Sequence, residues 1–419
     1  MLFRHNSFAI STLLGILFAI SISRAIQLPN DWAIAQWLIN YSHGFVKRGL
    51  PGTVFDPWIH AEGIGDIRHQ IDAVSLFIFC LMWIGIGLII RDLLIRLRFG
   101  TRVVWLSAAF LLSPVTVLSG ELVGYYDSII MTLAMLALFY VTKGNLWVPA
   151  ILQSISMFIH ESTLLISFPV VVAAVFLHQW RIKKENQKTF HWNKCMLFAW
   201  PILVVPLGAF SIVCVLQIHA IDRNIVQPPN IQAIEKLHIV SEKTIIDVKK
   251  GYNTSVIHFL KNQLPKLPKR IFRPQQFLGS LVPLLMMIWV LRRLWMQAHW
   301  AASALIFAVM LSPLAILGLA WDVARIHSFA YFTTLTMIWI CLREKSEALV
   351  FPRLDGRSTW LALLVLIIFV MNPASLFYHR PENISAVTRI LGYTITLLAL
   401  YACTRPKILR QPGAGQDKH

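Results

Sequence analysis

Long apolar runs recur along the whole chain and are separated by shorter polar segments. Many runs approach the ~20 residues that a helix needs to cross a bilayer. They are continuous, whereas strands of a membrane barrel alternate apolar and polar positions, so the pattern predicts helices. We expect an all-α polytopic membrane protein with about twelve spans, centred near residues 8–26, 71–90, 103–118, 128–142, 147–159, 163–178, 196–217, 277–291, 299–317, 328–342, 359–373 and 387–403.

One apolar run, residues 147–178, is too long for a single span. At ~1.5 Å per residue it would extend for about 48 Å, against a hydrocarbon core of ~30 Å. His160 and Glu161 interrupt it. Two short helices that meet at this pair keep both side chains away from the middle of the bilayer, and one long helix is the alternative.

Lys and Arg residues concentrate in alternate connections between the predicted spans. The basic segments are residues 91–102, 181–194, 292–293, 343–357 and 405–410, whereas the short connections on the other side carry few cations. This bias predicts cytoplasmic N- and C-termini. The exception is a long basic outer loop, residues 218–276, whose length lets it translocate regardless of charge.

The predicted domain organisation is simple. Residues 1–404 form a single transmembrane domain, in which residues 27–70 make a first outer loop with an amphipathic helix. Residues 405–419 are expected to be a disordered cytoplasmic tail.

Composition narrows the function classes. With 57% hydrophobic residues, 15 Trp and 25 Phe, the chain is not a soluble domain. The net charge of +18 is scattered over many loops, which suits membrane topology better than nucleic-acid binding. The five cysteines show no metal-ligand spacing, and no nucleotide-binding motif is present. No cofactor is therefore implied, although a divalent metal remains open.

The first outer loop holds the leading candidates for chemistry. Asp31 follows the first apolar run closely enough to serve as a base at the membrane edge, and helix N-capping is its alternative role. In the segment NYSHGFVKRGLPG, His43 precedes Lys47 and Arg48, two cations suited to holding a phosphate. The glycines of this segment would let the backbone approach an anion, and a charged interfacial turn is the alternative.

Other ionisable or polar residues lie at the same predicted outer face. Acids near span ends are costly unless they have a partner, which makes them functional candidates. Asp127 has helix capping as its alternative role, and Asp322 with Arg325 is either an internal salt pair or a phosphate site. The pair at 160–161 either lines an outward cavity or is structural. The full set is Glu121, Tyr125, Asp127, His160, Glu161, Asp322 and Arg325.

These features resemble the GT-C superfamily of membrane glycosyltransferases. The resemblance is carried by an acid just beyond the first span, a long first outer loop with helical character, and the GYYD element at 124–127 that opens a later span. The segments GFVKRGLPG (44–52), HE (160–161) and WDVAR (321–325) are similar to elements of bacterial polytopic proteins.

The resemblance implies a function at the outer face of a bacterial inner membrane. The donor would be a polyprenyl-phosphate-linked sugar, and the acceptor a glycan or a lipid-linked molecule. Asp31 would act as the general base of an inverting transfer, while Lys47, Arg48 and Arg325 would stabilise the departing phosphate.

Three other functions remain open. A polymerase or ligase of lipid-linked surface polysaccharide would share the fold and the outward cations. A transporter would carry polar residues near the middle of the bilayer, whereas most ionisable residues here lie at one face. An acyltransferase would need His160 and Glu161 to face the cytoplasm or a channel that leads to it.

Overall fold

The computed structural model of the chain describes residues 26–42, 44–59, 64–96, 119–120, 122–185, 192–222, 228–252, 300–318 and 323–343, with single positions at 8–23, 103–111 and 265. These residues are mostly helical and include no strand. Three helical stretches, Ile67–Arg96, Thr163–Trp180 and Met196–His219, are long and apolar enough to cross a membrane. Over the described residues, the predicted helical structure and the presence of helices suited to crossing a membrane are thus confirmed. The count of twelve and the orientation stay predictions, and the spans predicted at 277–291, 359–373 and 387–403 lie outside the described residues.

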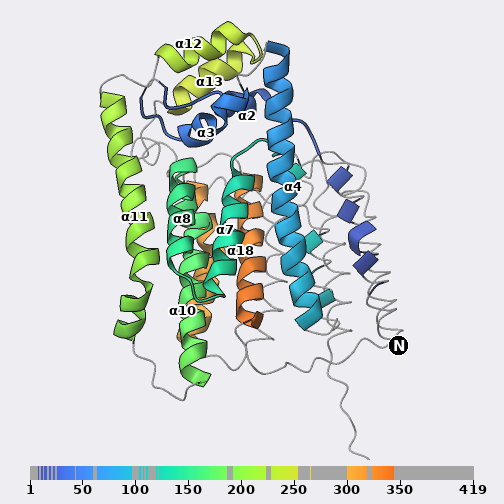
Figure 1. Cartoon of the computed structure of the whole chain (residues 1–419), viewed down its shortest axis with the longest axis vertical. Helices are drawn as coiled ribbons and strands as arrows, with labels where there is room; N and C mark the ends of the chain where they lie inside the picture. Colours follow the sequence, from blue (N-terminus) through green and yellow to red (C-terminus); the bar gives the residue numbers. More distant parts are fainter. Residues whose placement is uncertain are drawn as a thin grey trace, which may run out of the picture.

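Six helices stand side by side as a bundle (Figure 1): α4 (Ile64–Arg96), α7 (Asp127–Val141), α8 (Trp147–Ile159), α10 (Phe168–Glu185), α11 (Trp192–Asp222) and α18 (Val323–Arg343). Small side chains at the contacts let these helices approach closely, and Ala137, Ala150 and Ala174 are fully buried. On the outer surface Leu88 and Val215 are 57% and 64% exposed, as expected of side chains that face lipid.

The chain reverses direction at the predicted break in residues 147–178. Helix α8 ends at Ile159, a four-residue helix α9 (Thr163–Ile166) follows, and α10 then runs back through the bundle. A second break in helical geometry packs against this turn. It lies where α17 (Trp300–Leu311) continues as the 3₁₀ helix η2 (Ser312–Gly318). There Ser312 Oγ donates a hydrogen bond to Leu165 O at 2.8 Å. The prediction of two helices meeting at His160 and Glu161 is confirmed.

Four further helices cover one end of the bundle, and we call them the cap: α2 (Asp31–Trp37), α3 (Gly49–Ile59), α12 (Pro228–Leu237) and α13 (Glu242–Tyr252) (Figure 1). The cap packs on the bundle through one apolar cluster, in which Ile34, Ile59 and Val248 of the cap join Ile71 of α4 and Ile130 of α7. The described helices of two segments predicted as separate outer loops, α2 and α3 from 27–70 and α12 and α13 from 218–276, therefore pack together over the same end.

The cap is attached to the bundle through the turn before α7. The indole Nε1 of Trp37 donates to Gly124 O at 2.7 Å, and the hydroxyl of Tyr126 donates to Gln36 O at 2.6 Å. Gly124 has φ 90°, and a Cβ there would lie 2.8 Å from Pro29. The GYYD element therefore forms the surface of the bundle on which the cap packs.

The opposite end of the bundle is held by an ionic cluster between α4 and α18. Asp92 Oδ2 accepts hydrogen bonds from Trp339 Nε1 at 2.9 Å and from Arg96 Nε at 2.8 Å. Arg343 Nη1 lies 3.6 Å from the same oxygen. The basic segments that begin near residues 91 and 343 thus start at the same end of the bundle, as the charge pattern predicts.

Candidate functional site

Arg48, in the loop before α3, reaches from the cap to the turn after α8. Its Nη2 donates to Glu161 Oε1 at 2.5 Å and its Nε donates to Oε2 at 3.1 Å, which makes a bidentate pair. The two side chains are only 20% and 24% exposed. Arg48 also has φ 63°, a left-handed conformation that costs a non-glycine residue about 1–3 kcal/mol. The surrounding contacts thus hold this guanidinium in a fixed place.

The turn that carries Glu161 is built by its neighbours. His160 leaves helical geometry, with φ −159° and ψ 127°. Thr163 Oγ1 donates to Ser156 O at 2.9 Å, and Ser162 N donates to His160 Nδ1 at 3.1 Å. Because Nδ1 accepts a hydrogen bond, the neutral imidazole carries its proton on Nε2.

A second ion pair joins the first turns of α7 and α18. Arg325 Nε donates to Asp127 Oδ2 at 2.5 Å and its Nη2 donates to Oδ1 at 2.7 Å. The guanidinium also lies 4.7 Å from the centre of the Tyr125 ring. Asp127 does not cap its helix by a side-chain hydrogen bond, since the N-cap residue is Tyr126. Its carboxylate nevertheless lies at the positive end of the α7 dipole.

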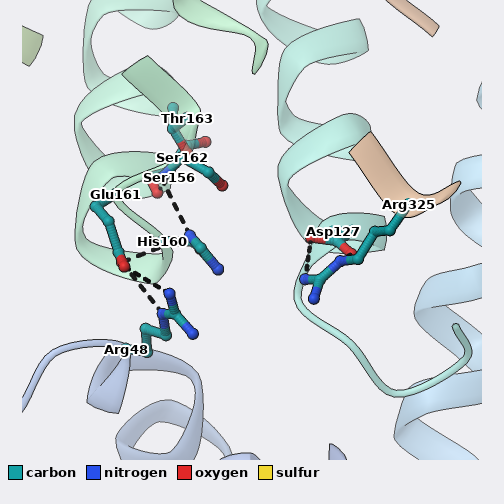
Figure 2. Close-up of polar contacts among 8 residues, drawn as sticks. All are labelled: Arg48, Asp127, Ser156, His160, Glu161, Ser162, Thr163 and Arg325. Atoms are coloured by element: carbon teal, nitrogen blue, oxygen red, sulfur yellow. Dashed lines mark hydrogen bonds and ion pairs between the residues drawn. The ribbon is translucent and has the colours of Figure 1, made fainter. Parts of the chain in front are cut away.

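Figure 2 shows the imidazole of His160 between the two ion pairs, with its Nδ1 directed toward Ser162. Burial, reinforced by Arg48, lowers the pKa of His160 to about 3, so the ring is neutral at pH 7. Its Nε2–H is therefore a neutral hydrogen-bond donor with a guanidinium on either side.

Lys47 adds a third cation to the site. Burial lowers the pKa of Lys47 to about 8, and the Glu161 carboxylate limits this shift. Burial alone would raise the pKa of Glu161, but Arg48 holds that pKa well below its usual range. At neutral pH the site thus combines Lys47, Arg48 and Arg325 with two carboxylates, and it keeps a surplus of positive charge.

Asp31 lies in the cap. It is the first residue of α2, and its Oδ2 accepts a hydrogen bond from Ser241 N at 3.0 Å. The N-cap role belongs to Asn30, whose Oδ1 accepts from Ala33 N at 3.0 Å. Asn30 Nδ2 also donates to the Tyr125 hydroxyl at 3.2 Å. Asn30, next to Asp31, is therefore connected to Arg325 through Tyr125, whose hydroxyl accepts from Asn30 and whose ring lies under the guanidinium.

The structure thus brings together Lys47, Arg48, Tyr125, Asp127, His160, Glu161 and Arg325 at the cap end of the bundle, with Asp31 in the cap itself. His43, Glu121 and Asp322 lie outside the described residues. The proposed pairing of Asp322 with Arg325 therefore stays a prediction, although Arg325 has Asp127 as a partner.

Two of the loop glycines, Gly49 and Gly52, have a packing role. A Cβ at Gly52 would collide with the carbonyl oxygen of Ile39, and a Cβ at Gly49 would lie 2.6 Å from the Tyr41 ring. These glycines are required because α3 packs directly on the residues that follow α2. Close approach of the backbone to an anion is not needed to explain them.

Sequence analysis missed the partners of the charged residues and the two aromatic anchors, Trp37 and Tyr126. The sequence does indicate that ion pairs could form, because two arginines and two acids lie near the ends of predicted helices at the same face of the membrane. The side chains that pair are 113 and 198 residues apart, so spacing alone does not match them.

Among the described residues, no group of three or more His, Cys, Asp or Glu side chains could hold a metal ion. Comparison with known proteins finds no matching family model, no similar curated protein and no similar solved structure.

Proposed function

We propose that the chain is a membrane glycosyltransferase that moves a sugar from a polyprenyl-phosphate donor to a glycan or lipid-linked acceptor at the outer face of a bacterial inner membrane. The observation that carries the proposal is the gathering of Lys47, Arg48, His160 and Arg325 at one end of the bundle, beneath a cap that bears Asp31. Such a site offers positive charge and an N–H donor to a phosphate at the level of the lipid headgroups.

The reaction follows from these groups. An acceptor hydroxyl attacks the anomeric carbon, the bond from that carbon to the phosphate oxygen breaks, and the lipid phosphate leaves with its electron pair. Lys47 and the guanidinium groups stabilise the charge that develops on the phosphate, and His160 Nε2–H donates to one of its oxygens. Preorganised donors of this kind are each worth about 10²–10³ in rate.

Asp31 is the best general base among the acids of this site. Glu161 and Asp127 are each held by a bidentate arginine, so the oxygens of both carboxylates are already engaged. Asp31 accepts a backbone N–H and is partly exposed, so it can take the proton of the acceptor hydroxyl.

The test is sugar transfer by the purified protein in liposomes, with a synthetic polyprenyl-phosphate sugar as donor. Asp31→Asn should lower the rate by about 10²–10⁴, the usual contribution of a general base. The melting temperature should stay unchanged, because the Asn side chain still accepts from Ser241 N.

The matched control is Asp56→Asn, a second cap carboxylate, which accepts from Asn40 Nδ2 at 2.8 Å and has no role in the proposed reaction. It should keep the activity of the unmodified chain. Transfer that survives in Asp31→Asn at the control rate would refute the assignment of the base. Transfer from oligosaccharide donors alone would make the protein a polymerase or ligase instead.

A further inference from the structure

A second feature lies away from the cap, on α4 in the half of the helix that leads to the Asp92 cluster. A groove of about 360 Å³ runs between α4 and residues 11–18 of the first apolar segment. Its volume is within the range of ligand sites, ~300–1,000 Å³. The lining is apolar except for Ser11 and Arg91, and Arg91 lies in the half of the α4 lining that is farther from the cap.

The groove is formed by two matching helical faces. On α4 the lining residues Trp83, Gly87, Arg91 and Leu94 recur at intervals of three and four, so they share one face. Residues 11, 14, 15 and 18 of the first segment follow the same spacing. At one end Phe18 closes the groove by packing on Trp83, with ring centres 4.7 Å apart.

Two glycines leave the middle of the groove empty. A Cβ added at Gly15 or at Gly87 would meet nothing within 4 Å. This differs from Gly85, one face away, where a Cβ would lie 2.7 Å from the Met135 methyl. The absence of side chains at 15 and 87 therefore serves no helix packing, and it provides room for a hydrocarbon chain.

The charge of Arg91 indicates which kind of lipid headgroup would bind at the groove. Arg91 is exposed and lies one turn beyond Gly87, next to the Arg96 and Arg343 cluster. A long side chain in this position can lay its methylene groups along the groove and place its guanidinium at headgroup level. Basic pockets between membrane helices on the cytoplasmic side select anionic lipid heads.

We infer that this groove binds one acyl chain of an anionic glycerophospholipid, with the lipid phosphate at Arg91. The site is separate from the cap, and it does not depend on the proposed transferase reaction. Its expected effect is to fix the first apolar segment against α4.

Photo-crosslinking tests the inference on the full chain in nanodiscs. A phosphatidylglycerol with a diazirine on one acyl chain should label peptides within residues 11–18 and 83–94, and the matching phosphatidylcholine should label them less. Gly87→Leu fills the groove and should abolish labelling there. Arg91→Gln should lower labelling by phosphatidylglycerol roughly fivefold, the effect of one cation near an anionic surface.

Gly208→Leu is the control, because a Cβ at Gly208 on α11 also meets nothing within 4 Å. It should leave labelling intact. Undiminished labelling in Gly87→Leu would overturn the inference, and so would equal labelling by the two lipids that Arg91→Gln does not change. If Gly87→Leu fails to fold, the result for Arg91→Gln decides. Displacement of phosphatidylglycerol by an equimolar polyprenyl phosphate would overturn the choice of occupant.

Discussion

At the residue scale, the two arginines of the site behave differently from Lys47. Each arginine is bidentate to a carboxylate, so its charge is compensated before any ligand arrives. Lys47 differs in that burial lowers its pKa to about 8, so its charge, unlike that of an arginine, is lost within the range of ordinary measurements. A bound phosphate would stabilise the ammonium form of this lysine, which couples ligand binding to its protonation.

This coupling predicts a pH dependence. Below about pH 8 the ammonium is present and donor affinity should be constant; above it the affinity should fall by about tenfold for each pH unit, because the neutral amine offers no charge. Calorimetric titration of the purified protein with a short-chain polyprenyl-phosphate sugar, whose phosphodiester keeps one charge throughout, measures this directly between pH 6 and pH 10.

Lys47→Arg and Lys47→Met separate charge from shape. Arginine stays protonated throughout the range, so the decline above pH 8 should disappear in Lys47→Arg. Methionine removes the charge, so affinity in Lys47→Met should be low and independent of pH. An unchanged inflection near pH 8 in Lys47→Arg would assign the titration to another group.

Residue identities could be predicted from the sequence better than residue partners. Polar groups are costly near a bilayer, so Asp127, His160, Glu161 and Arg325 stood out against their apolar surroundings. Their pairing depends on how α3, α7, α8 and α18 meet at one end, which local patterns do not encode. Gly52 shows the same limit, because its close contact with the Ile39 carbonyl cannot be read from the local sequence.

At the element scale, the cap depends on how closely α3 approaches the end of α2. Besides the missing Cβ at Gly52, Thr53 Oγ1 donates to Gly49 O at 2.8 Å and accepts from Tyr41 N at 2.8 Å. This arrangement fixes the start of α3, and with it Arg48. The position of the Arg48 guanidinium is thus set by backbone packing within the cap.

Gly52→Ala should therefore destabilise the protein although alanine favours helices. A methyl group forced against the Ile39 carbonyl acts as overpacking, which costs about 1–3 kcal/mol. Gly208→Ala, where the added methyl meets open space, should be neutral or slightly stabilising. Denaturation of both variants in the same detergent gives the free energies of unfolding, and equal values would show that α3 can shift without loss.

Apolar helices were predictable because a bilayer imposes length and composition on each span. The amphipathic helix of the first outer loop was also predicted and is present as α2, whereas the packing of the cap helices on one another was not predicted. Helices α2, α12 and α13 have mixed composition and gain their stability from one another, through contacts between residues about 200 apart, such as Asp31 and Ser241. The sequence marked residues 218–276 as a basic outer loop but gave no sign that part of it packs on α2.

At the scale of the whole molecule, the ion pairs described above lie at two opposite ends of the helix bundle. The cap and both ion pairs of the site lie at one end, and the Asp92 cluster with Arg96 and Arg343 lies at the other (Figure 1). The charge bias predicts that the Asp92 end is cytoplasmic. A lipid-linked sugar in the outer leaflet reaches the site only if this orientation is correct.

Single cysteines test the orientation. In a chain whose native cysteines are replaced by alanine, Glu242→Cys lies on exposed α13 in the cap, and Lys143→Cys lies on the exposed turn between α7 and α8 at the other end. In right-side-out spheroplasts a membrane-impermeant maleimide should label position 242 at once and position 143 only after permeabilisation. Both positions should react in detergent, which controls for accessibility. The reverse order would place the cap in the cytoplasm, where no donor of the outer leaflet could reach Lys47 and Arg325, and the proposed reaction would then lose its substrate.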